Sequence, residues 1–281
     1  MTSPSKRAKL ADELFAPAVD RFRKRRILTK GIDDLWGCDL LDMSKYVNEN
    51  KVPRTNTGYK FLLVVIDTFS KYLFLEPLQS KHGSRASQGF EKILKNSGRC
   101  PNLLHVDQGK EFFNKNFRAV CKNHGIDFYN TFSVQKSAIC ERVIRTINQK
   151  LSKHFERSGR HVWINFLPTL LNEYNTLNKH RSIGMTPSQV NKNNEDIVRG
   201  RLFPTPIRVI DKKPSFTTGQ RVRISRLKPK FGNKYEPKWS REVFIITKIN
   251  STDPVTYNIK DLNNNEISGK FYEKELQKTD F

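Results

Sequence analysis

The sequence predicts an α/β fold in two parts: a mixed five-stranded sheet flanked by helices, and then a small all-β barrel. Three observations support this prediction. Up to about residue 130, short apolar runs of strand length alternate with amphipathic runs of helical period. Residues 191–215 are polar and contain three prolines, which is typical of a linker. From residue 216, short alternating runs are separated by Gly and Asn turns, as in small barrels.

The expected elements follow one another in an order that limits the topology. The run 61–66 is continuously apolar, which predicts a strand buried on both faces. The order of three strands, helix, strand, helix, strand, helix allows the first and fourth strands to be neighbours. The core strands are expected at 35–43, 61–66, 72–75, 103–106 and 126–129, the helices at 84–96, 114–124, from 137 onward, at 163–177 and briefly after Thr186, and the barrel strands at 221–224, 243–246 and 256–259.

These elements predict four segments: a basic N-terminal arm at 1–30, an α/β core at 31–190, the linker at 191–215 and the barrel at 216–281. The arm carries two basic clusters, at 6–9 and 21–26. They suit DNA phosphates or nuclear import, and a solvated tail is the alternative. We expect a nuclear protein.

Charge gives the strongest compositional clue to a partner. The chain has 51 Lys and Arg against 28 Asp and Glu, a formal net charge of +23. Such an excess repels itself and favours a polyanionic partner, so we expect nucleic-acid binding. No apolar run is long enough to span a membrane, and we expect no membrane contact. The four cysteines form no Cys-x-x-Cys pair, which argues against a zinc module and favours reduced thiols.

Three carboxylates stand out: Asp39 on the first expected strand, Asp107 at the end of the fourth, and Glu141 on the helix that begins near 137. If the fold gathers them, their mutual repulsion is relieved by a pair of Mg²⁺ or Mn²⁺ ions. Two such ions are sufficient to catalyse in-line phosphoryl transfer without a covalent enzyme intermediate. Asp42 is the alternative to Asp39, and Asp67 is expected to cap a turn.

Basic side chains near these carboxylates are candidates for contacts with DNA phosphates. The helix that carries Glu141 presents a polar strip along one edge, and a solvated helix edge is the alternative explanation. His105 is expected to be a core histidine, and His180 with Arg181 to end a helix rather than to touch DNA. The DNA candidates are Lys110, Lys136, Arg142, Arg145 and Lys150 in the core, with Arg221 and Arg223 in the barrel.

At these residues the chain resembles a retroviral-type integrase core of the DDE class, and most closely the integrases of Maverick/Polinton transposons. The resemblance rests on five stretches that follow one another in order: 36–43, 59–72, 107–112, 141–146 and 180–187. Thirty-three residues separate Asp107 from Glu141, which is similar to the Maverick/Polinton spacing. Nothing before Asp34 resembles the zinc domain of retroviral integrases. The stretches 222–225 and 238–243 resemble a chromo-like or Src-homology-3-like barrel.

The resemblance implies a ribonuclease-H-like fold in which Asp39, Asp107 and Glu141 bind two Mg²⁺ or Mn²⁺ ions. It also implies 3′-end processing and strand transfer of transposon DNA into target DNA, carried out by a homo-oligomer. The barrel would bind DNA or chromatin, where Trp239 is either a core residue or one wall of a methyl-lysine cage. Two alternatives stay open: a domesticated DNA- or chromatin-binding protein without catalysis, and a ribonuclease-H-like nuclease.

Overall fold

The computed structural model describes residues 4–19, 22–25, 27–46, 56, 58–107, 109–130, 138–204, 213–226 and 236–281. The chain divides into two compact units. One joins residues 1–27 to residues 205–281, and the other spans residues 28–204. The sequence-based expectation of a separate arm at 1–30 therefore differs from the structure, which groups residues 1–27 with the C-terminal sheet.

The core unit is built on a mixed sheet of β1 (Leu35–Asp42), β2 (Phe61–Asp67), β3 (Leu73–Leu78), β4 (Leu103–Val106) and β5 (Asp127–Asn130). The strand order is β3-β2-β1-β4-β5. β1 pairs antiparallel with β2 and parallel with β4, so the predicted neighbourhood of the first and fourth strands is confirmed. The apolar run of β2 is buried on both faces, as expected.

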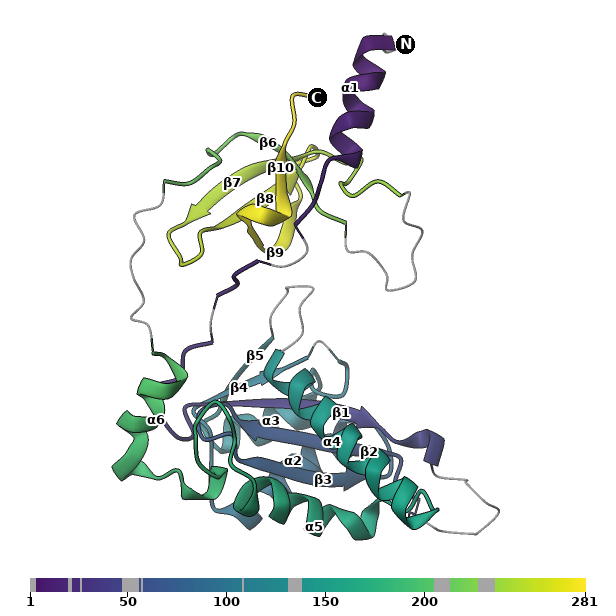
Figure 1. The fold of residues 1–281 in the computed structure, drawn as a ribbon, viewed down its shortest axis with the longest axis vertical. Helices are drawn as coiled ribbons and strands as arrows, with labels where there is room; N and C mark the ends of the chain where they lie inside the picture. The colour runs from purple at the N-terminus through teal and green to yellow at the C-terminus, as the bar shows by residue number, and fades with distance from the viewer. Residues whose placement is uncertain are drawn as a thin grey trace. The chain divides into compact units, whose positions relative to one another are not determined.

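Helices cover both faces of this sheet (Figure 1). On one face, α2 (Gly83–Ser97) and α3 (Lys115–Asn123) close a core around Trp36, Phe90 and Phe117. On the other face, α4 (Ala138–Ser158) and α5 (Leu167–Asn172) close a second core around Val64 and Ile147. The sheet therefore separates two hydrophobic layers, and α4 lies on the layer opposite to α2 and α3.

The segment expected as one helix at 163–177 has three backbone geometries in succession. It contains the 3-10 turn η3 (Ile164–Phe166), then α5, then the π-helical turn η4 (Glu173–Leu177). The widened turn places Asn175, which is buried, so that its side-chain amide bonds both the N–H and the carbonyl of Leu73 at 2.9 Å. A tertiary hydrogen-bond pair thus overrides the regular helical period.

The expected linker at 191–215 also differs from the structure at its start. The turns η5 (Pro187–Gln189) and η6 (Lys192–Asn194) lead into the helix α6 (Glu195–Leu202). Val198 is fully buried beside Phe69 and Ile183, and the Glu195 carboxylate accepts a hydrogen bond from the Ile32 backbone at 3.0 Å. This part of the expected linker therefore belongs to the core unit.

The C-terminal unit contains a second five-stranded sheet, which is antiparallel throughout, in the order β10-β6-β7-β8-β9. Its strands are β6 (Arg221–Ile224), β7 (Phe244–Asn250), β8 (Thr256–Asp261), β9 (Glu266–Tyr272) and β10 (Leu276–Lys278). The helix α1 (Pro4–Phe15) belongs to the same unit. In the parts of the chain that the structure describes, no helix is long and apolar enough to cross a membrane.

Candidate active site

The register of β1 and β4 brings the first two carboxylates together. The last pair of the parallel ladder is Cys38 with Val106. Asp39 and Asp107 are the next residue on each strand, and both side chains are half-buried. Neighbouring strands lie about 4.8 Å apart, so the structure places Asp39 and Asp107 side by side at one edge of the β1–β4 pair, as the sequence predicts.

Alternation along the strands decides which way these carboxylates face. Cys38 and Val106 contribute to the core beneath α2 and α3. Successive side chains of a strand point to opposite faces. Asp39 and Asp107 therefore face the layer that contains α4. One Asp39 oxygen accepts a hydrogen bond from the Leu40 backbone at 2.8 Å.

Glu141 lies in the first turn of α4, and its side chain is exposed. The residue before it, Cys140, is buried in the core shared with β2. Cys140 and Asp39 both contribute to the raised pKa of the Cys38 thiol, so the start of α4 lies beside β1. The buried face of α4 is formed by Cys140, Val143, Ile147, Leu151 and Phe155.

The three carboxylates do not form a ready-made metal site. Among the described residues, no group of three His, Cys, Asp or Glu side chains is close enough to hold a metal ion. The structure brings Asp39 and Asp107 together through the sheet and leaves Glu141 exposed on the adjoining helix. The donor set nevertheless suits Mg²⁺ or Mn²⁺, because carboxylate oxygens are the ligands that these hard cations prefer.

Cys38 and Glu111 lie close to the strand ends that carry Asp39 and Asp107. Burial raises the pKa of the Cys38 thiol well above its ordinary value, and the neighbouring Cys140 and Asp39 raise it further. The carboxylate of Glu111 adds a smaller effect in the same direction, so Glu111 also lies near Cys38. A Cβ atom on Gly109 would lie 2.1 Å from a Glu111 oxygen, so glycine lets the loop after Asp107 fold onto that carboxylate.

The two other aspartates have local structural roles. Asp42 lies three positions after Asp39, so it faces away from the α4 layer. It accepts a hydrogen bond from Ser44 at 2.8 Å, and the Ser44 hydrogen bonds lower the pKa of Asp42. Asp67 accepts from the Phe69 backbone at 3.0 Å within the β2–β3 turn, as expected of a turn cap. Neither carboxylate joins Asp39 and Asp107.

His105 is a buried core residue, as the sequence predicts. Its side chain is buried and lies edge-on to Tyr129, with ring centroids 5.4 Å apart. Burial lowers the pKa of His105, and the nearby Asp107 opposes that shift. A neutral imidazole therefore packs beside Asp107.

The polar strip of α4 is exposed, as the sequence predicts. Arg142 and Arg145 are open to solvent on the same helix as Glu141, and Lys110 is open in the loop after Asp107. Lys150 differs, because its ammonium group pairs with the Glu173 carboxylate at 2.6 Å. Lys136 lies outside the described residues. Among the predicted candidates that the structure describes, Arg142, Arg145 and Lys110 have exposed side chains near the carboxylates.

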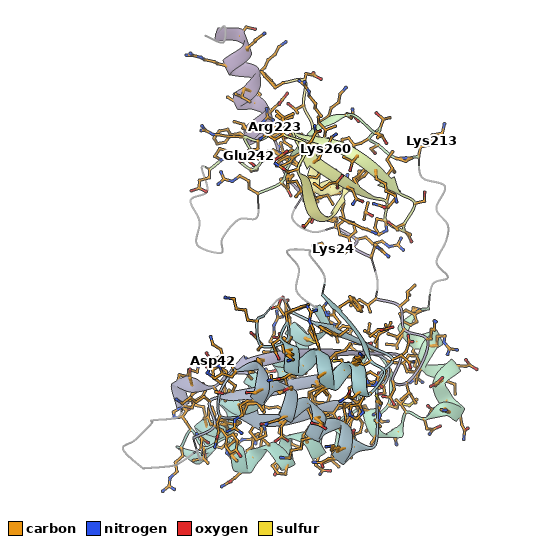
Figure 2. All side chains as sticks on the ribbon, turned by 180° about the vertical axis from the view of Figure 1, so that it is seen from behind. Lys24, Asp42, Lys213, Arg223, Glu242 and Lys260 are labelled. Atoms are coloured by element: carbon orange, nitrogen blue, oxygen red, sulfur yellow. The ribbon has the colours of Figure 1, made fainter. Side chains whose placement is uncertain are left out.

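The two candidate DNA contacts in the barrel, Arg221 and Arg223, differ in their exposure to solvent. Arg221 is exposed on β6, whereas Arg223 is only 1% exposed. Figure 2 labels Arg223 among the side chains of this unit. Its guanidinium pairs with Glu13 at 3.1 Å and donates to the carbonyls of Ser240 and Arg241 at 3.0 and 2.8 Å. These donors are used inside the C-terminal unit, so the expected contact of Arg223 with DNA would require these bonds to open.

Trp239 is a buried residue rather than an open cage wall. Its side chain is 4% exposed, and its indole N–H donates to the Ala16 carbonyl at 3.1 Å. The Leu14 carbonyl accepts from the backbone of Lys238 at 2.8 Å. The N-terminal segment thus covers Trp239, which favours the core role over the cage.

Lys71, which the sequence argument did not single out, lies near the start of α4. The charge of Arg142 contributes to the lowered pKa of Lys71, and burial followed by the charges of Lys71 and Arg142 lowers the pKa of His180. Lys71 belongs to the β2–β3 turn and His180 to the loop after η4. The only signal in the sequence is weak: Lys71 is a non-glycine residue in the turn that follows the buried strand β2. That Lys71 lies near Arg142 and His180 is apparent only from the fold.

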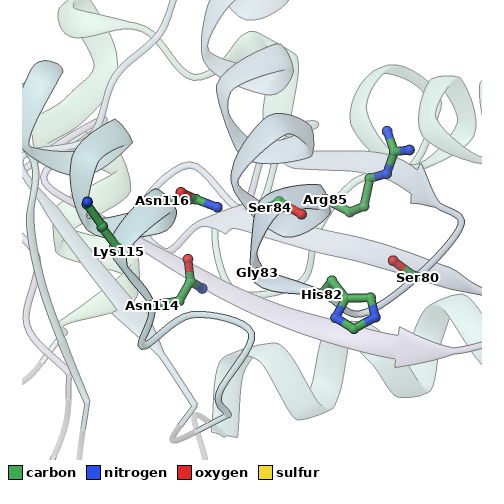
Figure 3. A pocket seen from close by; sticks show the side chains of 8 residues that line it. All are labelled: Ser80, His82, Gly83, Ser84, Arg85, Asn114, Lys115 and Asn116. Carbon is green, nitrogen blue, oxygen red and sulfur yellow. The ribbon is translucent and has the colours of Figure 1, made fainter.

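A pocket lies elsewhere on the core unit, where α2 and α3 begin (Figure 3). His82, Arg85 and Lys115 contribute to its lining, and none of the three carboxylates does. Gly83 is required here, because an added Cβ would lie 2.2 Å from the Asn114 amide that caps α3. The pocket is therefore separate from the carboxylate site.

Comparison with known proteins shows what the core is similar to. Residues 33–132 match the Integrase core domain family. A transposon-derived protein of Caenorhabditis elegans is 31% identical over 196 residues, which is 70% of this chain and 65% of that protein. The Pol polyprotein of Radiation murine leukemia virus (strain Kaplan) is 33% identical over 138 residues, 47% of this chain and 23% of the polyprotein. The chain thus spans under two thirds of the length of these relatives.

The fold itself is shared with a solved integrase assembly. The chain from the simian T-cell lymphotropic virus intasome, solved with the regulatory subunit B56 gamma of PP2A, superposes with a TM-score of 0.66 at 16% identity. The match covers 99% of this chain and 91% of the viral chain. At this identity the likeness shows the fold alone, and the sequence matches show that residues 33–132 are similar to the Integrase core domain family.

Proposed function

We propose that this protein is a DNA integrase of the transposon type, which trims DNA 3′ ends and joins them to target DNA. The observation that carries the proposal is the placement of the three carboxylates. Asp39 and Asp107 end neighbouring strands and face the layer of α4, whose first turn carries Glu141. The integrase core match over residues 33–132 supports the same reaction class. The Maverick/Polinton lineage remains part of this proposal.

Asp39, Asp107 and Glu141 are the residues that would hold two Mg²⁺ or Mn²⁺ ions. When bound, such ions neutralise the carboxylates, activate a water or 3′-hydroxyl and stabilise the leaving oxygen. The chain itself has to bind and orient the DNA. Lys110, Arg142 and Arg145 present exposed cations beside the site, and they would hold backbone phosphates in the line of attack.

We propose DNA as the main partner of both units. Work on two DNA ends predicts a homo-oligomer, and the basic clusters at 6–9 and 21–26 favour nuclear localisation. Exposed Arg221 replaces Arg223 as the candidate DNA contact of β6. A histone contact through Trp239 would require residues 14–16 to leave the indole that they cover. Direct DNA binding needs no such rearrangement.

A strand-transfer assay tests this proposal. The full chain is incubated with a plasmid target and labelled, pre-trimmed terminal-repeat oligonucleotides from candidate elements, first with Mn²⁺ and then with Mg²⁺. Joined products should form with wild-type protein and fall by about 1,000-fold or more in Glu141→Gln, since a residue of the metal-binding unit is lost. Glu156→Gln changes an exposed glutamate of the same helix and should leave joining unchanged.

The alternatives give different results in the same experiment. A domesticated binding protein would bind DNA equally with and without Mg²⁺ and would join nothing with any end sequence. A ribonuclease-H-like nuclease would nick DNA or cleave an RNA strand without joined products. Joining that survives in Glu141→Gln would contradict the proposed carboxylate site.

A further inference from the structure

The end of α1 is held on the C-terminal unit by hydrogen-bond donors that belong to the other part of that unit. The Leu14 carbonyl accepts from two backbone N–H groups, at 2.8 and 3.3 Å. The Ala16 carbonyl accepts from the Trp239 indole at 3.1 Å, and the Glu13 carboxylate accepts from β6 and from the chain after β10. In each of these contacts the N-terminal segment supplies the acceptor. We call residues 13–16 the strap.

The Glu13 carboxylate occupies a position that is built to bind an anion. One of its oxygens, Oε2, accepts from Nε of Arg223 at 3.1 Å and from the Thr279 hydroxyl at 2.8 Å. Arg223 and Thr279 are 1% and 4% exposed. The carbonyls of Ser240 and Arg241 accept from Nη1 at 3.0 and 2.8 Å, so they fix the guanidinium with its Nε toward the carboxylate. Guanidinium and hydroxyl groups are also donors that proteins use for phosphate oxygens.

Arg223 lies on the face of β6 that points away from the hydrophobic core. Its neighbours Val222 and Ile224 pack in the core of this unit, so by alternation Arg223 points to the opposite face. Arg221 lies on that same face two residues earlier, and it is exposed. The burial of Arg223 therefore comes from what covers this face, and Glu13 is part of that cover.

The N-terminal segment has a second attachment farther along the chain. The ring of Phe22 lies edge-on to that of Tyr272, with centroids 5.5 Å apart, and the Tyr272 hydroxyl accepts from the Arg25 backbone at 3.0 Å. Arg23 pairs with Asp253 at 2.7 Å. None of these contacts involves the strap. The strap can therefore open while the rest of the segment stays on the unit.

We propose that the strap is an autoinhibitory contact, in which Glu13 occupies the position of a DNA phosphate at Arg223 and Thr279. A phosphodiester, like a carboxylate, carries one negative charge and presents oxygen acceptors, so it can replace Glu13 at the same donors. When the strap opens, Arg223 joins Arg221 on the uncovered face of β6. The inference rests on the proposed binding of DNA to this unit, and it adds a contact that DNA has to displace.

DNA affinity in the absence of metal tests the inference separately from catalysis. The affinity of the full chain for a fluorescein-labelled duplex is measured by anisotropy in EDTA at several NaCl concentrations. Glu13→Gln removes the charge that competes with phosphate, so DNA should bind about tenfold more tightly, with a salt slope steeper by about 1. Asp12→Asn makes the same change of net charge at the exposed neighbouring acid and should change the affinity less than about twofold.

A double variant shows whether the gain comes from Arg223. Glu13→Gln combined with Arg223→Gln keeps the net charge of wild type and leaves no ion without its partner, and the gain in affinity should disappear. A Glu13→Gln protein that binds DNA as wild type does would overturn the inference. A double variant that keeps the whole gain would overturn it as well.

Hydrogen–deuterium exchange on the wild-type chain gives a measurement that needs no substitution. Adding the duplex in EDTA should accelerate exchange in the last turn of α1, because the strap opens, and should leave β8 unchanged. Unchanged or slower exchange in α1 would contradict the strap. Wild-type protein that joins DNA ends while Glu13→Gln gains no affinity would refute the strap alone. A gain in Glu13→Gln without joining by wild type would overturn only the proposed reaction.

Discussion

At the scale of single residues, Arg99 links three parts of the core sheet. Its guanidinium bonds Asp33, just before β1, at 2.6 Å and Asp67, at the end of β2, at 2.7 Å. It also lies over the rings of Trp36 and Tyr72, with centroid distances of 5.8 and 5.1 Å. Asp67 is fully buried, so Arg99 supplies the charge that its carboxylate needs.

Replacing Arg99 should therefore destabilise the core strongly. Arg99→Met leaves the Asp67 carboxylate buried without its cation, and we expect the free energy of unfolding to fall by about 3–5 kcal/mol. Urea denaturation monitored by circular dichroism measures the loss. Arg85→Met, at an exposed arginine of α2, is the matched control and should change stability by less than about 0.5 kcal/mol. Equal effects of the two substitutions would contradict the role of Arg99.

His180 should make folding stability depend on pH. Its pKa is about 4 in the folded chain and about 6.5 when unfolded. The unfolded state thus binds more protons between these values, and stability is lost as the pH falls through this window. The loss from pH 7 to about pH 4.5 should be smaller in His180→Asn by about 1–2 kcal/mol, after allowing for the partial exposure of the ring. Urea denaturation at both pH values measures it.

An exposed histidine provides the reference for this measurement. His124→Asn removes a ring that is open to solvent, and its pH dependence should match that of wild type. If His180→Asn also loses stability at acid pH as wild type does, then another group is responsible for that loss.

At the scale of elements, α1 is part of the C-terminal unit. The Glu13 carboxylate accepts from Arg223 at 3.1 Å and from the Thr279 hydroxyl at 2.8 Å, so it ties the helix to β6 and to the chain after β10. Leu14 is buried at the same contact. Farther along, Arg23 pairs with Asp253 at 2.7 Å. The N-terminal segment therefore continues to contact this unit beyond the helix.

Breaking the Glu13 contact should loosen the C-terminal unit selectively. Glu13→Gln leaves the buried Arg223 guanidinium without its carboxylate, which we expect to cost about 3 kcal/mol. Hydrogen–deuterium exchange should accelerate in β6 and remain unchanged in β1, since the latter belongs to the core unit. Asp12→Asn changes the exposed neighbouring acid and should leave both strands as in wild type. Unchanged exchange in β6 would show that the helix does not stabilise the sheet.

Local sequence patterns predicted most core elements within a few residues, because each buries a contiguous apolar stripe. They failed where a distant contact decides the geometry. The helix expected at 163–177 breaks into three forms around the bond from Asn175 to Leu73, and α6 forms inside the expected linker because Val198 fills a gap beside Phe69. β9 and β10 were not predicted at all.

At the scale of the whole molecule, each of the two units has a net positive charge. The core unit has 27 basic and 16 acidic residues, and the other unit has 24 and 12. A polyanion is therefore an expected partner for each of them. The exposed cations of α4 lie on the same helix as Glu141. We therefore expect the core unit to hold the DNA strand that reacts.

The sequence by itself determined the order of the core strands and helices and the charge, and it predicted the three candidate carboxylates, because each depends on residue types and short periods. The tertiary structure decided which residues meet. It placed Asp107 beside Asp39 through the β1–β4 register, buried Arg223 against Glu13, and bonded the Asn175 amide to Leu73. Such contacts join residues far apart in the chain, and only packing of the complete sheet and its helices selects them.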